Sequence, residues 1–201
     1  ITGDIDKGKE IHDEIVFKGL LEKHITIGTS LVDMYAKCGR LEKAKEVLEG
    51  LPMRDEVSWN AIITGYSQQR QFHESLDCFR KMQREGIYPA LVTLVCVLQA
   101  CGSTGAINVG KQIHEEISSR SLLEKHIILG NALVDMYAKC HMLVEARQAL
   151  EEIPLRDVDS WNTLIAAYAQ QGNCDGVFKC FEQMQNEDIP PDPSTYIGIM
   201  K

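Results

Sequence analysis

Histidines and cysteines are the residues of this chain best suited to metal binding or nucleophilic chemistry. Two histidines begin H-x-E triplets, His12-Asp13-Glu14 and His114-Glu115-Glu116. In zinc deaminases such a triplet supplies one metal ligand and the general acid/base, and a P-C-x-x-C segment supplies the other ligands. The chain has no such segment. We therefore interpret both triplets as structural.

The cysteines also argue against a metal or redox centre. There are seven, an odd number, and none forms a C-x-x-C pair. Cys38 and Cys140 lie about 100 residues apart and are not expected to share a metal. With no secretory signal, the pattern favours reduced thiols that pack as small hydrophobic side chains. The sequence also lacks a phosphate loop, a catalytic triad and an H-E-x-x-H motif. We predict no catalytic residue, no metal, no cofactor and no small-molecule ligand.

The composition is that of a folded protein, with 44% hydrophobic and 25% charged residues among 201. The net charge of −8 provides no overall basic field to attract nucleic acid or an anionic membrane. No apolar run approaches the roughly 20 residues of a membrane span. The chain begins with Ile1 and shows no leader segment, so we expect it to be part of a longer chain.

An internal repeat defines the elements that would position any functional residue. Residues 31–38 read LVDMYAKC, and so do residues 133–140, an offset of 102. Roughly half of all positions coincide at this offset, including LLEKHI at 20–25 and again at 122–127. Self-similarity at a fixed spacing is typical of repeat architectures.

The period of 102 divides into units of 31, 35 and 36 residues, each of which reads as a pair of helices. In the first complete unit, Leu31, Met34 and Tyr35 follow helical spacing, Gly39 interrupts it, and a second stripe begins at Leu41. A helix pair of this size cannot bury its apolar face alone, so the pairs must stack. We predict an all-α fold, an α-solenoid with a right-handed superhelical path. The proposed units are 1–24, 25–55, 56–90, 91–126, 127–157, 158–192 and 193–201.

These units resemble the pentatricopeptide repeat (PPR) family, and more narrowly the P, L and S repeats of the plant PLS class. The resemblance covers essentially the whole chain, whereas the constant 34-residue period of the tetratricopeptide repeat does not fit. It is carried by VSWNAIITGYSQ at 57–68, VTLVCVLQACGS at 92–103, GKQIHEEI at 110–117 and GNALVDMYAKC at 130–140. It implies S-type repeats at 25–55 and 127–157, P-type at 56–90 and 158–192, and L-type at 91–126, with a partial L-type repeat at 1–24 and the start of another at 193–201.

The resemblance implies binding of single-stranded RNA, one base per repeat, with the repeats running 5′ to 3′ along the RNA. In the family, the fifth residue of a repeat faces the base and the last residue supports it. The pair Thr29 with Asp55 implies guanine. The pair Asn131 with Asp157 implies uracil. The third, Asn162 with Asp192, implies uracil.

Two repeats depart from that pattern. Asn60 implies a pyrimidine, but Ala90 replaces the acidic last residue. A methyl group cannot hold the Asn60 amide, so we expect weak discrimination there. Val95, paired with His126, cannot hydrogen-bond a base edge, and we predict no readout. The implied site is guanine, pyrimidine, any base, uracil, uracil.

The second residue of each repeat helps to sandwich the base in the family. Asp159 departs from that role, because a carboxylate cannot stack and would lie near the phosphates, which weakens the uracil prediction at Asn162. Short side chains able to pack on a base occupy the other second positions: Thr26, Val57, Val92 and Ile128.

Several of these residues have an alternative, purely structural interpretation. Lys37 and Lys139 resemble family lysines that contact phosphate, but a lysine there also offsets a helix dipole. The asparagines and aspartates could cap helices or end turns. Trp59 and Trp161 could stack on bases, but we expect both to pack between helices.

The resemblance implies sequence-specific RNA binding within an organellar RNA-processing factor, in the mitochondrion or the chloroplast. PLS arrays are similar to those of C-to-U editing factors, whose deaminase-like domain lies downstream. Editing-complex proteins would bind through the L-type repeats, and no membrane is involved. The alternative is a protein-interaction scaffold, which the acidic charge favours.

Overall fold

The structure, a computed structural model, describes residues 2–200, with side chains from residue 5 onward. Within this range the chain forms twelve α-helices, one short 3₁₀ turn and no strand. The predicted all-α fold is therefore confirmed. Ile1 and Lys201, at the ends of the first and last proposed units, lie outside the described residues.

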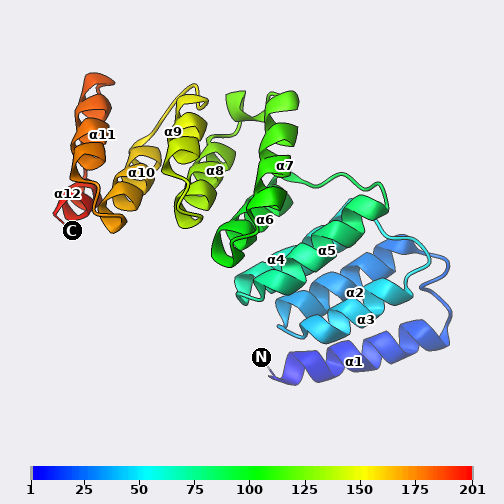
Figure 1. Cartoon of the computed structure of the whole chain (residues 1–201). Coiled ribbons are helices and arrows are strands. Elements are labelled where there is room, and N and C mark those ends of the chain that lie inside the picture. The colour runs from blue at the N-terminus through cyan, green and yellow to red at the C-terminus, as the bar shows by residue number, and fades with distance from the viewer. Residues whose placement is uncertain (1, 201) are drawn as a thin grey trace. The chain divides into compact units, whose positions relative to one another are not determined.

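The chain divides into two compact units, residues 1–100 and 101–201. Helix α6 begins in the first unit and ends in the second (Figure 1). The helices of the first unit are α1 (Thr2–Phe17), α2 (Ile25–Lys37), α3 (Leu41–Gly50), α4 (Glu56–Gln68), α5 (Phe72–Arg84) and the start of α6 (Leu91–Thr104). Those of the second are α7 (Ile107–Ser119), η1 (Leu122–Glu124), α8 (Ile127–Lys139), α9 (Leu143–Glu151), α10 (Val158–Gln170), α11 (Cys174–Asn186) and α12 (Pro193–Ile199).

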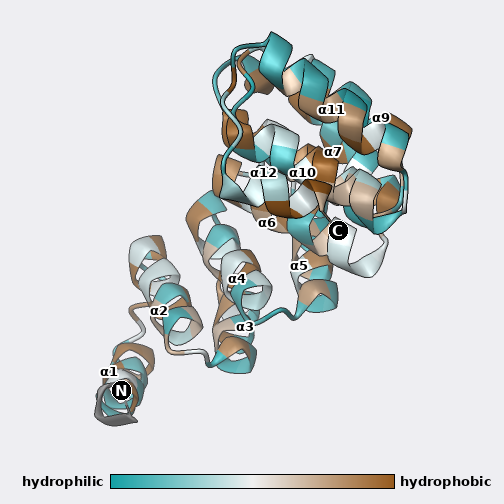
Figure 2. Cartoon of the chain, turned by 90° about the vertical axis from the view of Figure 1, so that its left-hand side faces the viewer, coloured by the Kyte–Doolittle hydropathy of each residue, from teal (hydrophilic) through white to brown (hydrophobic). Residues whose placement is uncertain are grey.

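In the first unit the helices pack as pairs, and the pairs stack. Helix α2 packs on α3, α4 packs on α5, and α2 also lies against α4. The apolar stripe of α4 is fully buried, from Trp59 through Ile62 and Ile63 to Tyr66. Apolar and polar residues share every helix, as stacking of amphipathic pairs requires (Figure 2).

The second unit repeats this arrangement. Helix α8 pairs with α9 and α10 with α11, while α8, α10 and α12 contact one another in series. Leu129, Leu133, Leu164 and Ile165 are fully buried in this stack. The first helices of successive pairs thus form one layer within the unit.

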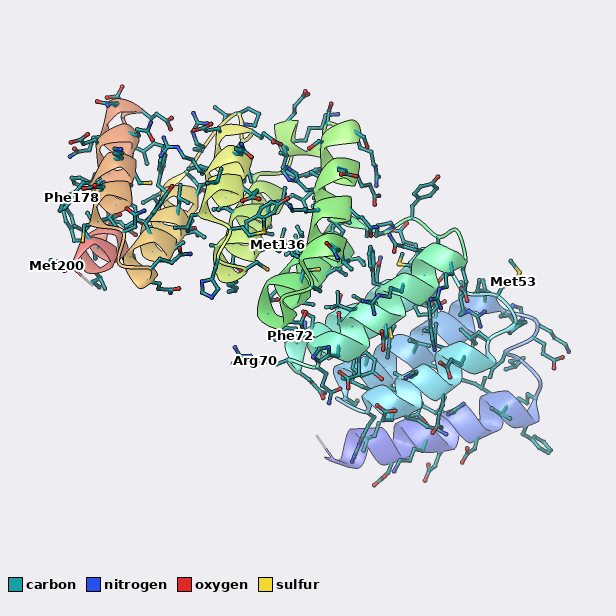
Figure 3. The ribbon with its side chains drawn as sticks, in the orientation of Figure 1. Met53, Arg70, Phe72, Met136, Phe178 and Met200 are labelled. Carbon is teal, nitrogen blue, oxygen red and sulfur yellow. The ribbon has the colours of Figure 1, made fainter. Side chains whose placement is uncertain are left out.

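A left-handed residue ends several helices, whether or not it is glycine. Four glycines have a positive φ, and the residue 102 positions away from each also has a positive φ although it is not glycine. The pairs are Gly19 and Ser121, Gly39 and His141, Gly172 and Arg70, and Gly86 and Asp188. The exposed Arg70 side chain extends away from the helices (Figure 3). The way the helix ends, with an N–H bonded back to a carbonyl of the last turn, therefore sets the backbone conformation.

The histidines of both H-x-E triplets pack between helices, as interpreted from the sequence. His12 is hydrogen-bonded through Nδ1 to the Tyr35 hydroxyl over 3.0 Å, and His114 to Tyr137 over 2.9 Å. In each pair the rings meet edge to face. These contacts join the second helix of one repeat to the first helix of the next.

Both tryptophans belong to the core, as expected, and do not offer a stacking surface. Trp59 is only 2% exposed, and its indole N–H donates to Glu85 over 3.0 Å. Arg54 pairs with the same carboxylate at 2.7 Å. Trp161 makes the same contact to Glu187 in the second unit.

Candidate nucleic-acid interface

In the second unit, the predicted pair Asn131 and Asp157 is brought together. Asn131 lies on α8 and Asp157 is the N-cap of α10. Asn131 Nδ2 donates to Asp157 Oδ1 over 3.3 Å. A third residue joins them, because Ser160 Oγ lies 2.6 Å from both Asn131 Oδ1 and Asp157 Oδ1. The amide is thus contacted through both of its polar atoms.

The pair Asn162 and Asp192 has the same geometry one repeat later. Asn162 Nδ2 donates to Asp192 Oδ1 over 2.9 Å, and Thr195 Oγ1 donates to Asn162 Oδ1 over 2.6 Å. Asp192 is the N-cap of α12 and accepts from the Thr195 backbone N–H. The predicted role as support and the alternative role as cap are therefore combined in one carboxylate.

In the first unit, Thr29 and Asp55 are also in contact. Thr29 Oγ1 lies 3.3 Å from both carboxylate oxygens of Asp55 and 3.1 Å from the Ile25 carbonyl. Asp55 caps α4 through the Ser58 backbone N–H. Thr29 is only 9% exposed, less than the half-buried asparagines at the equivalent positions.

Asn60 is held although Ala90 offers no polar side chain. Thr93 Oγ1 donates to Asn60 Oδ1, and Asn60 Nδ2 donates to Glu56 Oε1 over 3.4 Å. Ala90 thus takes no part in holding the amide, and the weak discrimination expected at Asn60 stays a prediction. Other side chains occupy the place of the missing carboxylate.

The remaining pair, Val95 and His126, provides no comparable contact. Val95 is half-buried on α6. His126 is the N-cap of α8, and its side chain makes no capping hydrogen bond. Neither side chain presents a polar group positioned in the way that the asparagine amides are.

The Asp157 carboxylate is held ionised by its contacts. Burial raises its pKa, but hydrogen bonds from the Ser160 side chain and backbone and from Asn131 outweigh burial, so the pKa lies below the ordinary aspartate value. The Asp192 pKa is also lowered, chiefly by the Thr195 backbone N–H and the Asn162 amide.

Grooves flank Asn60 and Asn162, one within each unit. The groove of the first unit has a volume of about 320 Å³ and includes Asn60, Val57, Val92 and Lys37. That of the second unit has about 580 Å³ and includes the residues 102 positions later, with Asn162 among them. The repeat thus places the same kind of groove beside the same motif position.

The predicted sandwiching residues are exposed. Val57 is 58% exposed, Val92 49% and Ile128 60%, and Thr26 is also exposed. In the groove of the second unit their place is taken by Asp159 and Ser194. An apolar base face would therefore find better packing in the groove beside Asn60 than in that beside Asn162.

Lys37 and Lys139 lie on the grooves but are already paired. Lys37 Nζ lies 2.7 Å from Asp33, and Lys139 Nζ lies 2.6 Å from Asp135, one turn earlier on the same helix. Both pairs are exposed, and such pairs contribute only about 0.2–1 kcal/mol. A phosphate could therefore displace either carboxylate at little cost.

Family models described as PPR repeat match residues 29–55 and 131–158, and models described as PPR repeat family match 54–103 and 156–201. Together they cover most of the chain. With the stacked helix pairs described above, these matches show that the chain belongs to the pentatricopeptide repeat family.

Among curated relatives from Arabidopsis thaliana, pentatricopeptide repeat-containing protein CRR2, chloroplastic, is 39% identical over 96% of this chain and 30% of its own length. At4g18520, chloroplastic, is 34% identical over 96% of this chain and 31% of its own. At3g09040, mitochondrial, is 36% identical over the whole chain and 19% of its own length. The chain thus spans less than a third of these relatives.

Solved structures show the same fold. PPR10 in complex with an 18-nucleotide psaJ RNA element has a TM-score of 0.74 at 23% identity, covering 98% of this chain and 30% of that chain. The PPR domain of Arabidopsis thaliana protein-only RNase P 1 in complex with tRNA has a TM-score of 0.66 at 12% identity. This match covers 90% of this chain and 97% of that chain. The predicted α-solenoid is confirmed.

No other centre stands out in the part of the chain that the structure describes. There, no cluster of three or more His, Cys, Asp or Glu side chains could hold a metal ion, and no helix is long and apolar enough to cross a membrane. The cysteines of these residues form no disulfide, and burial raises the pKa of Cys78 and Cys180 to about 11.

Sequence reasoning missed the hydroxyls that complete these contacts. A readable signal exists, because each is a Ser or Thr three residues after the last residue of the preceding repeat. That spacing is typical of an N-terminal capping box. The hydroxyls that contact the asparagine amides are those of Thr93, Ser160 and Thr195. Glu56 had no such signal, since its role follows from a contact one helical turn away.

Proposed function

We propose that the chain binds single-stranded RNA in a sequence-specific manner, with one base per repeat in the order guanine, pyrimidine, any base, uracil, uracil. The observation that supports this proposal best is the fixed amide of Asn131 and Asn162, each held by a carboxylate and a hydroxyl. An amide contacted in this way keeps one N–H and one oxygen lone pair for a base edge.

The surroundings of the amides also support RNA. Val57 and Val92 line the same groove as Asn60 and provide exposed apolar surface for the faces of a base. A lysine at the same groove offers a contact for the phosphate. Recognition of single-stranded RNA combines these three kinds of contact.

Fluorescence anisotropy with short RNAs tests the proposal. We expect the chain to prefer GCAUU over GCAGG by about tenfold, in line with about 1–3 kcal/mol per matched base contact. Asn131→Ser, with Asp157 kept, should shift the preference at the fourth base from U towards G. This variant retains Asp157 as the cap of α10. Binding with an altered base preference, rather than loss of binding, would itself show that the variant is folded.

Two outcomes would contradict the proposal. Equal binding of both RNAs would exclude base reading at the last two positions. Absence of binding to any RNA at low salt would show that these residues do not bind RNA by themselves.

We further propose that the chain is part of an organellar RNA-processing factor, most specifically a PLS-class C-to-U editing factor, acting in the mitochondrion or the chloroplast. The names of several relatives, such as CRR2, chloroplastic, and At3g09040, mitochondrial, support the location. In this proposal the repeats fix the register of the RNA, and a catalytic domain or partner outside these residues carries out the deamination. Comparing editing in organelles with and without the full-length protein tests this step.

A second candidate function is a protein-interaction scaffold, with editing-complex proteins bound through the L-type repeat. Two features favour it: the groove of the second unit contains Asp135 and Asp159 beside its single lysine, and Val95 is apolar. A partner protein that co-purifies with the wild-type chain but not with the Val95→Arg variant would support this function, provided that the variant still binds RNA as the wild type does.

A further inference from the structure

Asn60 lacks an acidic last residue, yet its amide makes the same two kinds of contact as Asn162. A hydroxyl, that of Thr93, donates to the amide oxygen. A carboxylate, that of Glu56, accepts from the amide nitrogen over 3.4 Å. Only the source of the carboxylate differs, since Asn162 uses the cap of the following helix.

Glu56 occupies a position that is not acidic in any other repeat. It begins α4 and lies four residues before Asn60, on the same face of the helix. The corresponding first residues of the other repeats are Ile25, Leu91, Ile127, Val158 and Pro193. Three complete repeats have asparagine at the fifth position, and only the repeat 56–90 ends in a residue that is not acidic. The acidic first residue, Glu56, occurs in that same repeat.

We propose that Glu56 replaces the missing carboxylate and, together with the hydroxyl of Thr93, makes Asn60 a selective pyrimidine-reading position. This inference rests on the proposed RNA binding. A donor at the amide oxygen and an acceptor at the nitrogen oppose rotation of the amide by 180°, because the rotated group would place oxygen against carboxylate. The free N–H and lone pair are then presented to the base in one arrangement.

Thr93 carries the larger share of this role. Its side chain is fully buried, so its hydroxyl has no water to replace the amide oxygen as a partner. Glu56 is exposed, and its contact with the amide is long. Asn60 itself lines the groove together with Val57 and Val92, where a base would be packed.

The test compares RNAs that differ only at the second base, GCAUU and GAAUU. We expect wild type to prefer the cytosine by about tenfold, within the range of matched base contacts. Thr93→Val should reduce this preference to about threefold or less. The preference for uracil over guanine at the fifth base, read by Asn162, should be unchanged in the same variant.

Three further variants separate the hydroxyl from packing. Thr93→Ser keeps the hydroxyl and should keep the preference. Ala90→Asp introduced into Thr93→Val supplies the acidic last residue and should restore it to about tenfold. Thr195→Val is the matched control, because Asp192 still holds Asn162, and should lose less at the fifth base than Thr93→Val loses at the second. Melting temperatures show whether each variant is folded.

The outcomes distinguish this inference from the proposed function. A wild type that discriminates at the fifth base but not at the second overturns the role of Thr93 and Glu56 and leaves RNA binding intact. A full preference retained by folded Thr93→Val overturns it as well. Loss of discrimination at every base overturns the proposed function and this inference with it.

Discussion

At the residue scale, one aspartate serves two helices. Asp157 Oδ1 accepts from the Ser160 backbone N–H, which caps α10, and from the Asn131 amide on α8. The charge that satisfies the start of one helix therefore also orients the side chain that would meet the base. The same oxygen of Asp192 does both for α12 and Asn162. Stability and the proposed reading of the base are therefore coupled at these positions.

This coupling can be separated by two substitutions. Asp157→Ala removes the cap and the support, so we expect a loss of about 1 kcal/mol in the free energy of unfolding together with the uracil preference at the fourth base. Asn131→Ala removes the proposed reading side chain and its hydrogen bonds to Asp157 and Ser160 but keeps the cap of α10, so it should cost less stability than Asp157→Ala. Urea unfolding and anisotropy measure the two effects. Equal stability of the two variants would contradict the capping role.

The acid dependence of stability follows from the same carboxylate. The pKa of Asp157 is lower in the folded chain than the value of about 3.9 expected when unfolded. Between the two values the unfolded state binds more protons, so stability rises with pH. The stabilisation is therefore complete above about pH 4 and is lost as the pH falls through the folded-state pKa.

Asp157→Asn provides the comparison, because asparagine also caps helices but does not titrate. We expect the melting temperature of wild type to fall more than that of this variant between about pH 6 and about pH 3. The same slope in both proteins would contradict the ionised state assigned to Asp157.

At the element scale, the sequence marks the starts of several helices by their capping residues but marks the ends of helices less clearly. An aspartate followed three residues later by Ser or Thr marks the starts of α4, α10 and α12, and could be read from the sequence. The residues that end helices are less informative, since His141 and Gly39 adopt the same left-handed conformation at equivalent places. The hydrogen bonds that close the last helical turn impose the conformation at both places, and the side chain of residue 141 tolerates it.

The tolerated strain predicts a stabilising substitution. His141 has φ of +60° and is exposed. The left-handed conformation costs an L-residue about 1–2 kcal/mol, and the greater freedom of glycine in the unfolded chain offsets part of that gain. We expect His141→Gly to raise the free energy of unfolding by about 0.5–1 kcal/mol.

The matched variant is Gly39→His, at the equivalent turn with φ of +71°. It should destabilise by a similar amount, and thermal or urea unfolding measures both. A destabilising effect of His141→Gly would show that the imidazole makes a contact worth more than the backbone strain.

At the scale of the whole molecule, the repeat predicts the fold well and the site only in part. Helical spacing and the offset of 102 were sufficient for the stacked pairs and their buried stripes, because burial of an amphipathic face leaves few alternatives. The pairing of Asn131 with Asp157 followed from the family resemblance. The support of Asn60 did not, because Thr93 belongs to the next repeat and reaches Asn60 only when the helix pairs stack, whereas Glu56 contacts it along a single helical turn.

Charge is the other property of the whole molecule that bears on function. The chain carries 29 acidic and 21 basic residues, so any attraction for phosphate must come from individual lysines rather than from the overall field. Lys37 and Lys139 are the basic residues at the two grooves, and each is held near the groove by an aspartate. Binding should therefore depend on salt, but with a small slope.

Removing both lysines tests this balance. Each phosphate contact on single-stranded RNA contributes about 0.7 to the slope of log K against log salt. The double variant Lys37→Ala with Lys139→Ala should therefore lower the slope by about 1.4 and weaken binding at low salt, while base preferences stay unchanged. Lys43→Ala is the control, because Lys43 is also exposed and paired with an acidic residue, Glu46, but lies on the second helix of its repeat. Anisotropy titrations at several salt concentrations measure the slope. A lysine that contacts a phosphate displaces counterions from the RNA, so its removal must lower the slope. An unchanged slope in the double variant would therefore show that both lysines pair only with their aspartates and do not contact phosphate.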